Sequence, residues 1–257
     1  MAKKVTLSIA IAVLNEEKNL EACLSSVTSM SDEIVVVDGG STDNTVAIVK
    51  KFTSKIIRTD NPSIFHINKQ KALEACTGEW ILQLDADEVV TEDLKNEIIG
   101  TINNKQKTIN GYYIPRKNYF WGHLMKKGGQ YPDYVIRLLR NGKARFPCKS
   151  VHEQIEVEGE VRYLHEPLEH CAYRTKEDYW KKAQAYTTLT AIEMKKNGVH
   201  KNIWTWFVYN ILKPKLTFLS LFIRHKGFMD GWYGFLFAYY SALQFTIAYR
   251  KYRKSVK

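Results

Sequence analysis

The sequence predicts an α/β protein with a Rossmann-like, mostly parallel sheet flanked by helices, followed by a C-terminal helical extension. Three observations support this prediction. Short apolar runs alternate with segments of helical spacing through the first half of the 257-residue chain. Polar clusters, each with at least one acidic residue, stand directly after three of the apolar runs. After residue 174 the composition changes, and Lys, Arg and aromatic side chains become dense.

The first half reads as alternating strands and helices. Leu7–Val13 is a continuous apolar run, which is typical of a parallel strand covered on both faces. Strand and helix in short alternating units favour a parallel sheet with right-handed crossovers. The expected strands are Leu7–Val13, Glu33–Val37, Lys55–Ile57 and Trp80–Leu84, and the expected helices are Glu16–Val27, a helix capped at Ser41–Asp43, Ile67–Ala75 and Glu92–Ile102.

The second half is less regular. Strands are expected at Tyr112–Pro115, Val135–Leu139 and Gln154–Val157, separated by breaks such as Phe-Pro-Cys. Glu177–Lys196 reads as one long helix that ends at Asn197-Gly198. We therefore expect one domain over residues 1–174 and a basic, aromatic-rich helical extension over residues 175–257.

The charge is distributed unevenly between these two parts. The formal net charge is +11, and the chain from Lys176 onward holds 15 Lys and Arg against four acids, so residues 1–175 are neutral. Such an asymmetry indicates a polyanionic partner for the extension. A composition of 45% hydrophobic and 25% charged residues excludes disordered and fibrous classes.

The cysteines and the N-terminus bear on the compartment. Four cysteines stand far apart with no CxxC pair, which favours reduced thiols over a zinc site. The apolar run Leu7–Val13 is too short for a signal-peptide core with a cleavage site. We therefore expect the catalytic part to face the cytoplasm.

The three polar clusters lie where open parallel sheets bind ligands, at the carboxyl ends of strands. They are Asn15-Glu16, Asp38–Ser41 and Asp85–Glu88. The polarity of loops in general would account for one such cluster but poorly for three. Asp85 and Asp87, separated by one residue after a buried strand, suit Mg²⁺ or Mn²⁺ that bridges a diphosphate.

The same segments carry a family resemblance. Val13–Glu17, Val35–Asp43 and Thr77–Trp80 leading into Asp85–Glu88 resemble glycosyltransferase family 2 in order and spacing. Gly129–Leu138 and Val151–Glu153 resemble the branch that includes the lipopolysaccharide inner-core β-1,4-glucosyltransferases, and so does Gly227–Gly231. The resemblance implies a GT-A fold, a nucleotide-sugar donor, Mg²⁺ or Mn²⁺, and inversion at the anomeric carbon. It implies a nucleotide-sugar half over about residues 1–110 and an acceptor half over about 111–174.

The resemblance also implies roles for single residues. Asp38 would accept a hydrogen bond from the uracil ring, and Lys69 would approach the diphosphate. Asp85 would contact ribose or the metal, Asp87 would be the main metal ligand, and His152 would complete the metal site. The base pocket would be lined by Ala12, Leu14 and Glu16.

An inverting transfer needs a general base near the acceptor hydroxyl. Asp133, with Arg137 four residues later, resembles the acidic residue and Arg of the family pattern. Glu153 is the second candidate for the base. A structural role for Asp133, capping a turn after Pro132, stays open.

The extension contains Trp232–Tyr249, 18 residues without a charge, followed by the basic cluster Arg250–Lys254. This length is at the lower limit for a membrane span. Aromatic residues beside clustered cations favour a helical hairpin lying in the headgroup layer. A true span and a helical cover on the catalytic domain remain alternatives.

Together these observations predict a transferase on the cytoplasmic face of the inner membrane, bound peripherally to the anionic lipid surface. It would move a hexose from UDP-glucose or a similar donor to a lipopolysaccharide-core or other lipid-linked acceptor. Nucleotidyltransferases begin with a Gly-rich loop, which Val13–Glu16 lacks. A nucleic-acid binder would show a recognisable module, and none is present. An inactive scaffold that keeps the fold is the remaining alternative.

Overall fold

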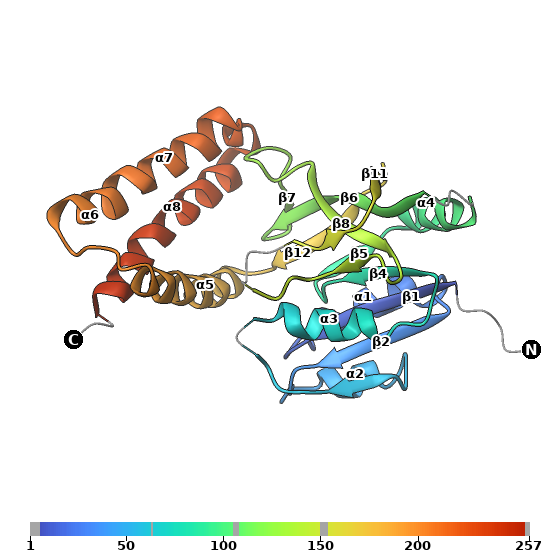
Figure 1. The fold of residues 1–257 in the computed structure, drawn as a ribbon. Helices are drawn as coiled ribbons and strands as arrows, with labels where there is room; N and C mark the ends of the chain where they lie inside the picture. Colours follow the sequence, from blue (N-terminus) through green and yellow to red (C-terminus); the bar gives the residue numbers. More distant parts are fainter. Residues whose placement is uncertain (1–5, 63, 105–107, 150–153, 255–257) are drawn as a thin grey trace, which may run out of the picture. The chain divides into compact units, whose positions relative to one another are not determined.

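A computed structural model describes residues 6–62, 64–104, 108–149 and 154–254 (Figure 1). The chain forms two compact units. The first comprises Met1–Arg116 and Tyr134–His170, and the second comprises Lys117–Asp133 and Cys171–Lys257. Residues 117–133 therefore belong with the C-terminal helices, a grouping that the sequence did not predict. A functional boundary at residue 174 stays a prediction.

The first unit begins with the alternating strands and helices that the sequence predicts. The strands are β1 (Leu7–Val13), β2 (Glu33–Asp38), β3 (Ile56–Arg58), β4 (Trp80–Leu84) and β5 (Glu88–Val90), and the helices are α1 (Leu20–Thr28), α2 (Thr45–Val49), α3 (His66–Glu74) and α4 (Glu92–Asn103). Further strands follow: β6 (Ile109–Phe120), β8 (Asp133–Arg140), β9 (Ala144–Arg145), β10 (Glu156–Val157), β11 (Glu160–Tyr163) and β12 (Leu168–Tyr173). Strands β6, β8 and β12 each continue from one unit into the other.

The main sheet has the strand order β3-β2-β1-β4-β8-β6-β12-β5. Strands β3, β2, β1 and β4 pair in parallel. Beyond β4 the sheet changes direction, because β8 pairs antiparallel with β4 and β12 pairs antiparallel with β5. The α/β prediction is confirmed, and the sheet is mixed, with its parallel part confined to the N-terminal half.

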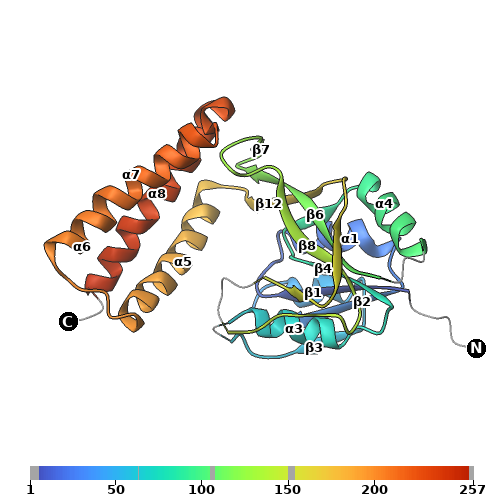
Figure 2. The ribbon, with the colours of Figure 1, turned by 45° about the horizontal axis from the view of Figure 1, so that its top comes forward.

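Side chains alternate between two apolar cores, as the pleat of a strand requires. Leu7, Ile9 and Ile11 of β1 pack in a core with residues of α1, α2 and α4, whereas Ala10 packs in a second core with residues of α3. The helices therefore cover both faces of the parallel strands (Figure 2). Because β1 is buried on both faces, six of its seven residues are apolar, and only Ser8 is polar.

The second unit is mainly helical. Its elements are β7 (His123–Leu124), α5 (Lys176–Lys196), α6 (Ile203–Phe207), the π-helical turn η1 (Val208–Leu212), α7 (Lys213–Leu219), the π-helical turn η2 (Ser220–Arg224), the 3₁₀ turn η3 (Gly227–Asp230) and α8 (Gly231–Lys254). A capping box at Thr175 and Asp178 starts α5. Helix α8 packs against α5 and against α7. No helix in the described ranges is long and apolar enough to cross a membrane.

Within the second unit, Asp230 fastens residues 117–133 to the helices. Its buried carboxylate accepts hydrogen bonds from the backbone N–H groups of Lys126, at 3.0 Å, and Lys127, at 2.8 Å. The N–H of Gly128 donates to the His225 carbonyl at 2.9 Å. The Gly-Phe-Met-Asp-Gly segment noted in the sequence thus fixes the loop that leads to Asp133.

Close backbone contact at Gly234 generates a stability prediction. A Cβ added at Gly234 would lie 1.9 Å from the Gly227 carbonyl oxygen, so Gly234→Ala must displace backbone and should cost about 2 kcal/mol or more. At Gly100, on α4, an added Cβ meets nothing within 4 Å. Gly100→Ala should therefore be neutral or stabilise by up to about 1 kcal/mol. Thermal unfolding of both variants measures the difference, and equal midpoints would contradict the close packing of η3 on α8.

Candidate functional site

The loops after β1 and β2 are joined by hydrogen bonds at the carboxyl edge of the parallel strands. Val13 pairs with Asp38 in register, and the Gly39 N–H donates to the Val13 carbonyl at 2.9 Å. Asn15 takes a left-handed conformation (φ 55°), which Asn tolerates, and its side chain accepts from the Thr42 N–H at 2.8 Å. Two of the three polar clusters therefore form one connected surface.

The residues predicted to hold a nucleotide base lie on this surface or at its edge. Asp38 is buried at the end of β2 and accepts from the Ser41 N–H at 3.1 Å. Ala12 and Leu14 are half-buried at the end of β1 and just beyond it. Glu16 accepts from the Asn19 amide at 2.8 Å, while its own N–H donates to Thr45. The structure brings these four residues to adjacent strand ends, and their nucleotide contacts stay a prediction.

The third cluster, after β4, is organised by charge. The carboxylate of Asp85 contacts Lys69 Nζ through one oxygen and Arg137 Nη2, at 2.7 Å, through the other. Burial opposes ionisation, but Arg137 and Lys69 outweigh it and hold the pKa of Asp85 well below its usual range. Asp85 is therefore ionised, and both of its oxygens are engaged by cations. Lys69 thus contacts Asp85, and its predicted approach to the diphosphate stays a prediction.

Glu88 completes this charge cluster. Its fully buried carboxylate lies 2.7 Å from Arg137 Nη2 and 3.3 Å from Arg116 Nη1. The Asp85 N–H donates to Glu88 Oε2 at 2.9 Å, and the Glu88 N–H donates to the Asp85 carbonyl at 3.0 Å. Arg137 also donates to the side-chain oxygen of Gln83. These reciprocal bonds fix the conformation of the Asp85–Glu88 loop.

The sequence placed Glu88 in the third polar cluster without giving it a role, and it did not indicate Arg116 or Gln83 as parts of the site. Gln83 is a polar residue inside the otherwise apolar, wholly buried strand β4, and this was the signal that it needed a buried partner. Glu88 gave no such signal, because acidic residues often begin the loop before a helix. Arg116 lies on a strand distant in sequence, and nothing local indicates its partner.

Asp87, the main predicted metal ligand, lies beside a histidine that the sequence did not associate with it. His170 Nε2 is 3.5 Å from Asp87 Oδ1, and the two side chains are only 15% and 11% exposed. The contact follows from strand pairing, because His170 of β12 is in register with Glu88 of β5. The buried Cys23 thiol is close to the same carboxylates, and burial, with Glu88 and Asp87, raises its pKa well above the usual value.

Of the two acids, Asp87 is better placed than Asp85 to bind a divalent cation. Asp87 and His170 would supply an oxygen and a nitrogen donor, and water and phosphate oxygens would complete the shell of Mg²⁺ or Mn²⁺. Asp85 would have to give up Lys69 or Arg137 to bind a metal. His152 and Glu153 lie outside the described residues. Within the described ranges, no group of three or more His, Cys, Asp or Glu side chains could hold a metal ion.

Asp133 lies in the second unit, at the start of β8. The amide of Asn118 donates to Asp133 Oδ2 at 3.0 Å and to the Gln130 carbonyl at 2.9 Å. The half-buried carboxylate is therefore oriented by a neutral donor. This arrangement is compatible with both the predicted base and the structural alternative.

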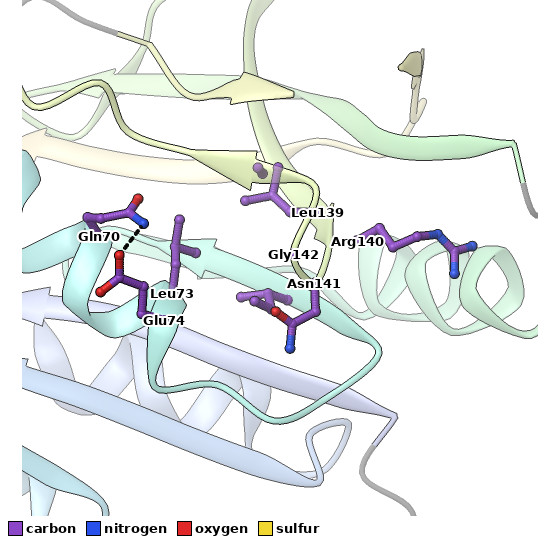
Figure 3. A pocket seen from close by; sticks show the side chains of 9 residues that line it. Gln70, Leu73, Glu74, Leu139, Arg140, Asn141 and Gly142 are labelled. Carbon is purple, nitrogen blue, oxygen red and sulfur yellow. Dashed lines mark hydrogen bonds between the residues drawn. The ribbon is translucent and has the colours of Figure 1, made fainter. Parts of the chain in front are cut away.

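A pocket of about 170 Å³ opens elsewhere in the first unit, between α3 and the end of β8 (Figure 3). Gln70 lines it, and its amide donates to Glu74 at 2.8 Å and accepts from the Phe146 N–H at 2.8 Å. Gln70 thus has a structural role on α3 while the neighbouring Lys69 contacts Asp85. None of the predicted site residues lines this pocket, so we do not assign it to the site.

Comparison with known proteins identifies a family. Residues 8–160 match the Glycosyl transferase family 2. The lipopolysaccharide core biosynthesis glycosyltransferase LpsC of Rhizobium meliloti is 31% identical over 94% of this chain and 92% of LpsC. An uncharacterized glycosyltransferase of Rickettsia felis is 27% identical over 90% of this chain and 83% of its own. The crystal structure of S. aureus TarS 1-349 in complex with UDP-GlcNAc has a TM-score of 0.50 at 17% identity, covering 97% of this chain and 88% of that chain.

The buried ion cluster generates a second stability prediction. Glu88→Gln keeps the shape of the side chain but removes the charge that faces Arg137 and Arg116, and should cost about 2–4 kcal/mol of unfolding free energy. Glu92→Gln is the matched control, because Glu92 is 79% exposed and pairs with Lys95 on the surface. It should change stability by less than about 0.5 kcal/mol. Urea unfolding at neutral pH compares them, and equal losses would mean that the cluster does not stabilise the loop.

Proposed function

Because the chain belongs to glycosyl transferase family 2, we propose that it is an inverting hexosyltransferase acting on a lipopolysaccharide-core or other lipid-linked glycan. The observation that carries this proposal is the Asp85–Asp87 loop, held in one conformation by Arg137 and Glu88 beside the ends of β1 and β2. The name of LpsC, which assigns it to lipopolysaccharide core biosynthesis, supports the acceptor class. The UDP-GlcNAc in the complex with TarS supports a UDP-sugar donor, and we propose UDP-glucose or a similar hexose donor.

The donor would bind along the strand ends. Asp38 can accept a hydrogen bond from the imide N–H of uracil, with Ala12, Leu14 and Glu16 around the base. Asp85 would accept from ribose hydroxyls. Lys69, which Asp85 holds at the site, would meet the negative charge of the diphosphate. An anionic diphosphate near Lys69 would compete with Asp85 for the same cation, so donor binding and the charge cluster would be coupled.

The cofactor that the family implies is Mg²⁺ or Mn²⁺, and we assign it to Asp87 with His170 as a second ligand. The predicted ligands Asp85 and His152 stay candidates for completing the site. When bound, such an ion neutralises charge that develops on the leaving diphosphate. The protein contributes a fixed carboxylate and a nearly dry environment, which strengthens electrostatic interactions.

We propose Asp133 as the general base. In an inverting displacement, the acceptor hydroxyl oxygen forms a bond to the anomeric carbon while the bond from that carbon to the diphosphate oxygen breaks. The hydroxyl proton passes to the Asp133 carboxylate, and the bond electrons leave with the nucleotide. Asn118 orients this carboxylate. Glu153 is the alternative base.

We place the enzyme on the cytoplasmic face of the inner membrane, bound peripherally to anionic lipid through the extension at residues 175–257. A nucleotidyltransferase is disfavoured by the family membership. An inactive scaffold with the same fold would bind a UDP-sugar without turning it over, and an activity measurement separates the two.

The metal assignment is tested by Asp87→Ala. Nucleotide release from a UDP-sugar should depend on Mn²⁺ or Mg²⁺ in the parent protein, and the variant should lose roughly a hundredfold or more of that rate. Asp93→Ala, which changes an exposed carboxylate in the first turn of α4, should leave the rate unchanged. Full turnover by Asp87→Ala in the presence of a chelator would refute the metal-assisted mechanism.

The base assignment is tested by Asp133→Asn. The amide has the same shape but cannot take the proton, so transfer should fall by roughly a hundredfold or more while the donor dissociation constant stays the same. Titration with a UDP-sugar measures binding, and glycan product formation measures transfer. Unchanged transfer would remove the role from Asp133 and direct the same substitution to Glu153.

A further inference from the structure

The second unit exposes a dense group of large apolar side chains. Of the 18 such side chains that are exposed in the described ranges, 12 lie between Ile203 and Trp232, which we call the outer segment. The other six are five tyrosines and Ile192. Tyrosine carries a polar hydroxyl, so the exposed aliphatic, Trp, Phe and Met side chains belong almost entirely to the outer segment. They are Ile203, Trp204, Trp206, Phe207, Ile211, Leu212, Leu216, Leu219, Ile223, Phe228, Met229 and Trp232.

The helices of the outer segment have an inner side and an outer side. On the inner side, Tyr209 stacks on Tyr249 of α8 at 5.3 Å, and Phe218 and Phe222 meet Phe235 of α8 edge-on. Helices α6 and α7 run along α8, as Figures 1 and 2 both show. Yet no residue from Ile203 to Arg224 is buried, so the rest of this helical run stays open.

The exposed residues follow helical spacing. Phe207, Leu212, Leu216, Leu219 and Ile223 recur every three to five residues, as expected for one helix face. The five-residue interval spans the π-helical turn Val208–Leu212, and a π-turn holds more residues than an α-turn. The π-turn thus helps to keep the apolar residues on one side. Contiguous exposed apolar surface of this kind marks a binding face.

The charge of the outer segment identifies what it binds. Between Ile203 and Trp232 the chain has four Lys and Arg residues, and Asp230 is the one acid of this segment. Asp230 itself is buried and bonded to the Lys126 and Lys127 backbone, so it offers little negative charge to a partner. A second copy of this face would bring like charges together, whereas an anionic surface complements them.

We propose that the outer segment lies in the headgroup layer of an anionic bilayer, with its apolar side chains inserted and Lys215, Arg224 and Lys226 at the phosphates. Amphipathic helices with Trp and Phe on one side and cations beside them bind membranes in this way. The inference rests on the lipid-linked acceptor proposed above. It names the face of the protein that binds the membrane in which that acceptor lies. That face runs from α6 through η3 to Trp232 and leaves out the rest of the uncharged stretch Trp232–Tyr249, because Ala238, Ala242 and Tyr249 of α8 are buried.

The apolar part is tested with the full chain and vesicles of phosphatidylcholine with or without phosphatidylglycerol. Leu216→Ser combined with Ile223→Ser should weaken co-sedimentation with the anionic vesicles roughly tenfold or more. Ile192→Ser combined with Tyr186→Ser changes comparably exposed residues of α5 and should alter binding by less than about twofold. Equal losses in the two variants would overturn the assignment of the face.

The charges are tested in the same assay. Lys215→Glu combined with Arg224→Glu should weaken binding roughly tenfold or more, whereas Arg250→Glu combined with Arg253→Glu, at the end of α8, should have less than about a twofold effect. The opposite order would overturn the inference in favour of the α8 end. If the parent protein turns over a UDP-sugar but binds no anionic vesicle, the inference fails and the transferase proposal stands. If it binds vesicles but never turns over a donor, the transferase proposal fails instead.

Discussion

The buried guanidinium of Arg137 is the constraint on which the first unit depends. A charge with so little solvent contact is tolerated only with compensating partners, and Arg137 has Asp85, Glu88 and the Gln83 oxygen. Two carboxylates keep it charged and raise its pKa against the effect of burial. Arg137 lies on β8, which pairs antiparallel with β4. The parallel strands by themselves therefore do not supply the cation that holds the acidic loop after β4. The turn in strand direction beyond β4 is therefore a condition for placing Asp85 and Asp87.

The sequence predicts those elements whose apolar pattern matches their burial in the fold. Strands β1 and β4 have the bounds that their apolar runs predict, because burial on both faces leaves only Ser8 as a polar residue in β1 and only Gln83 in β4. The position of β8 beside β4 could not be predicted, since its burial pattern is compatible with several neighbours. The grouping of residues 117–133 with the C-terminal helices depends on Asp230, more than a hundred residues away from Lys126 in the chain.

The residues of the candidate site also divide into those that the sequence indicates and those that it does not. The sequence indicates Asp38, Asp85 and Asp87 because they are acids at or just beyond the ends of buried strands. Lys69 was identified through its place in the family pattern. His170 and Arg116 could not be found, because each meets its acid through strand neighbours distant in sequence. Nothing in the local sequence around His170 indicates a role in the site. Its position beside Asp87 is a consequence of the β5–β12 register, which no short motif encodes.

The uneven charge of the chain reflects two arrangements of its cations: those paired with acids in the first unit and those exposed on part of the second unit. In the first unit, acids are paired with cations within the fold: Asp85 and Glu88 with Arg137, and Glu33 with Lys55. Burial raises the pKa of Glu33, but hydrogen bonds from Lys55, Ser8 and Thr77 outweigh it and lower this pKa to about 2. Such pairing accompanies the neutrality of residues 1–175. In the second unit, Lys251 donates to Gln184, Thr187 and Thr188 of α5, so part of the basic charge is structural. Lys215, Arg224 and Lys226 are exposed among apolar side chains that nothing in the described chain covers. Net charge alone thus indicates a polyanion, whereas the separation of paired from exposed cations indicates which helices meet it.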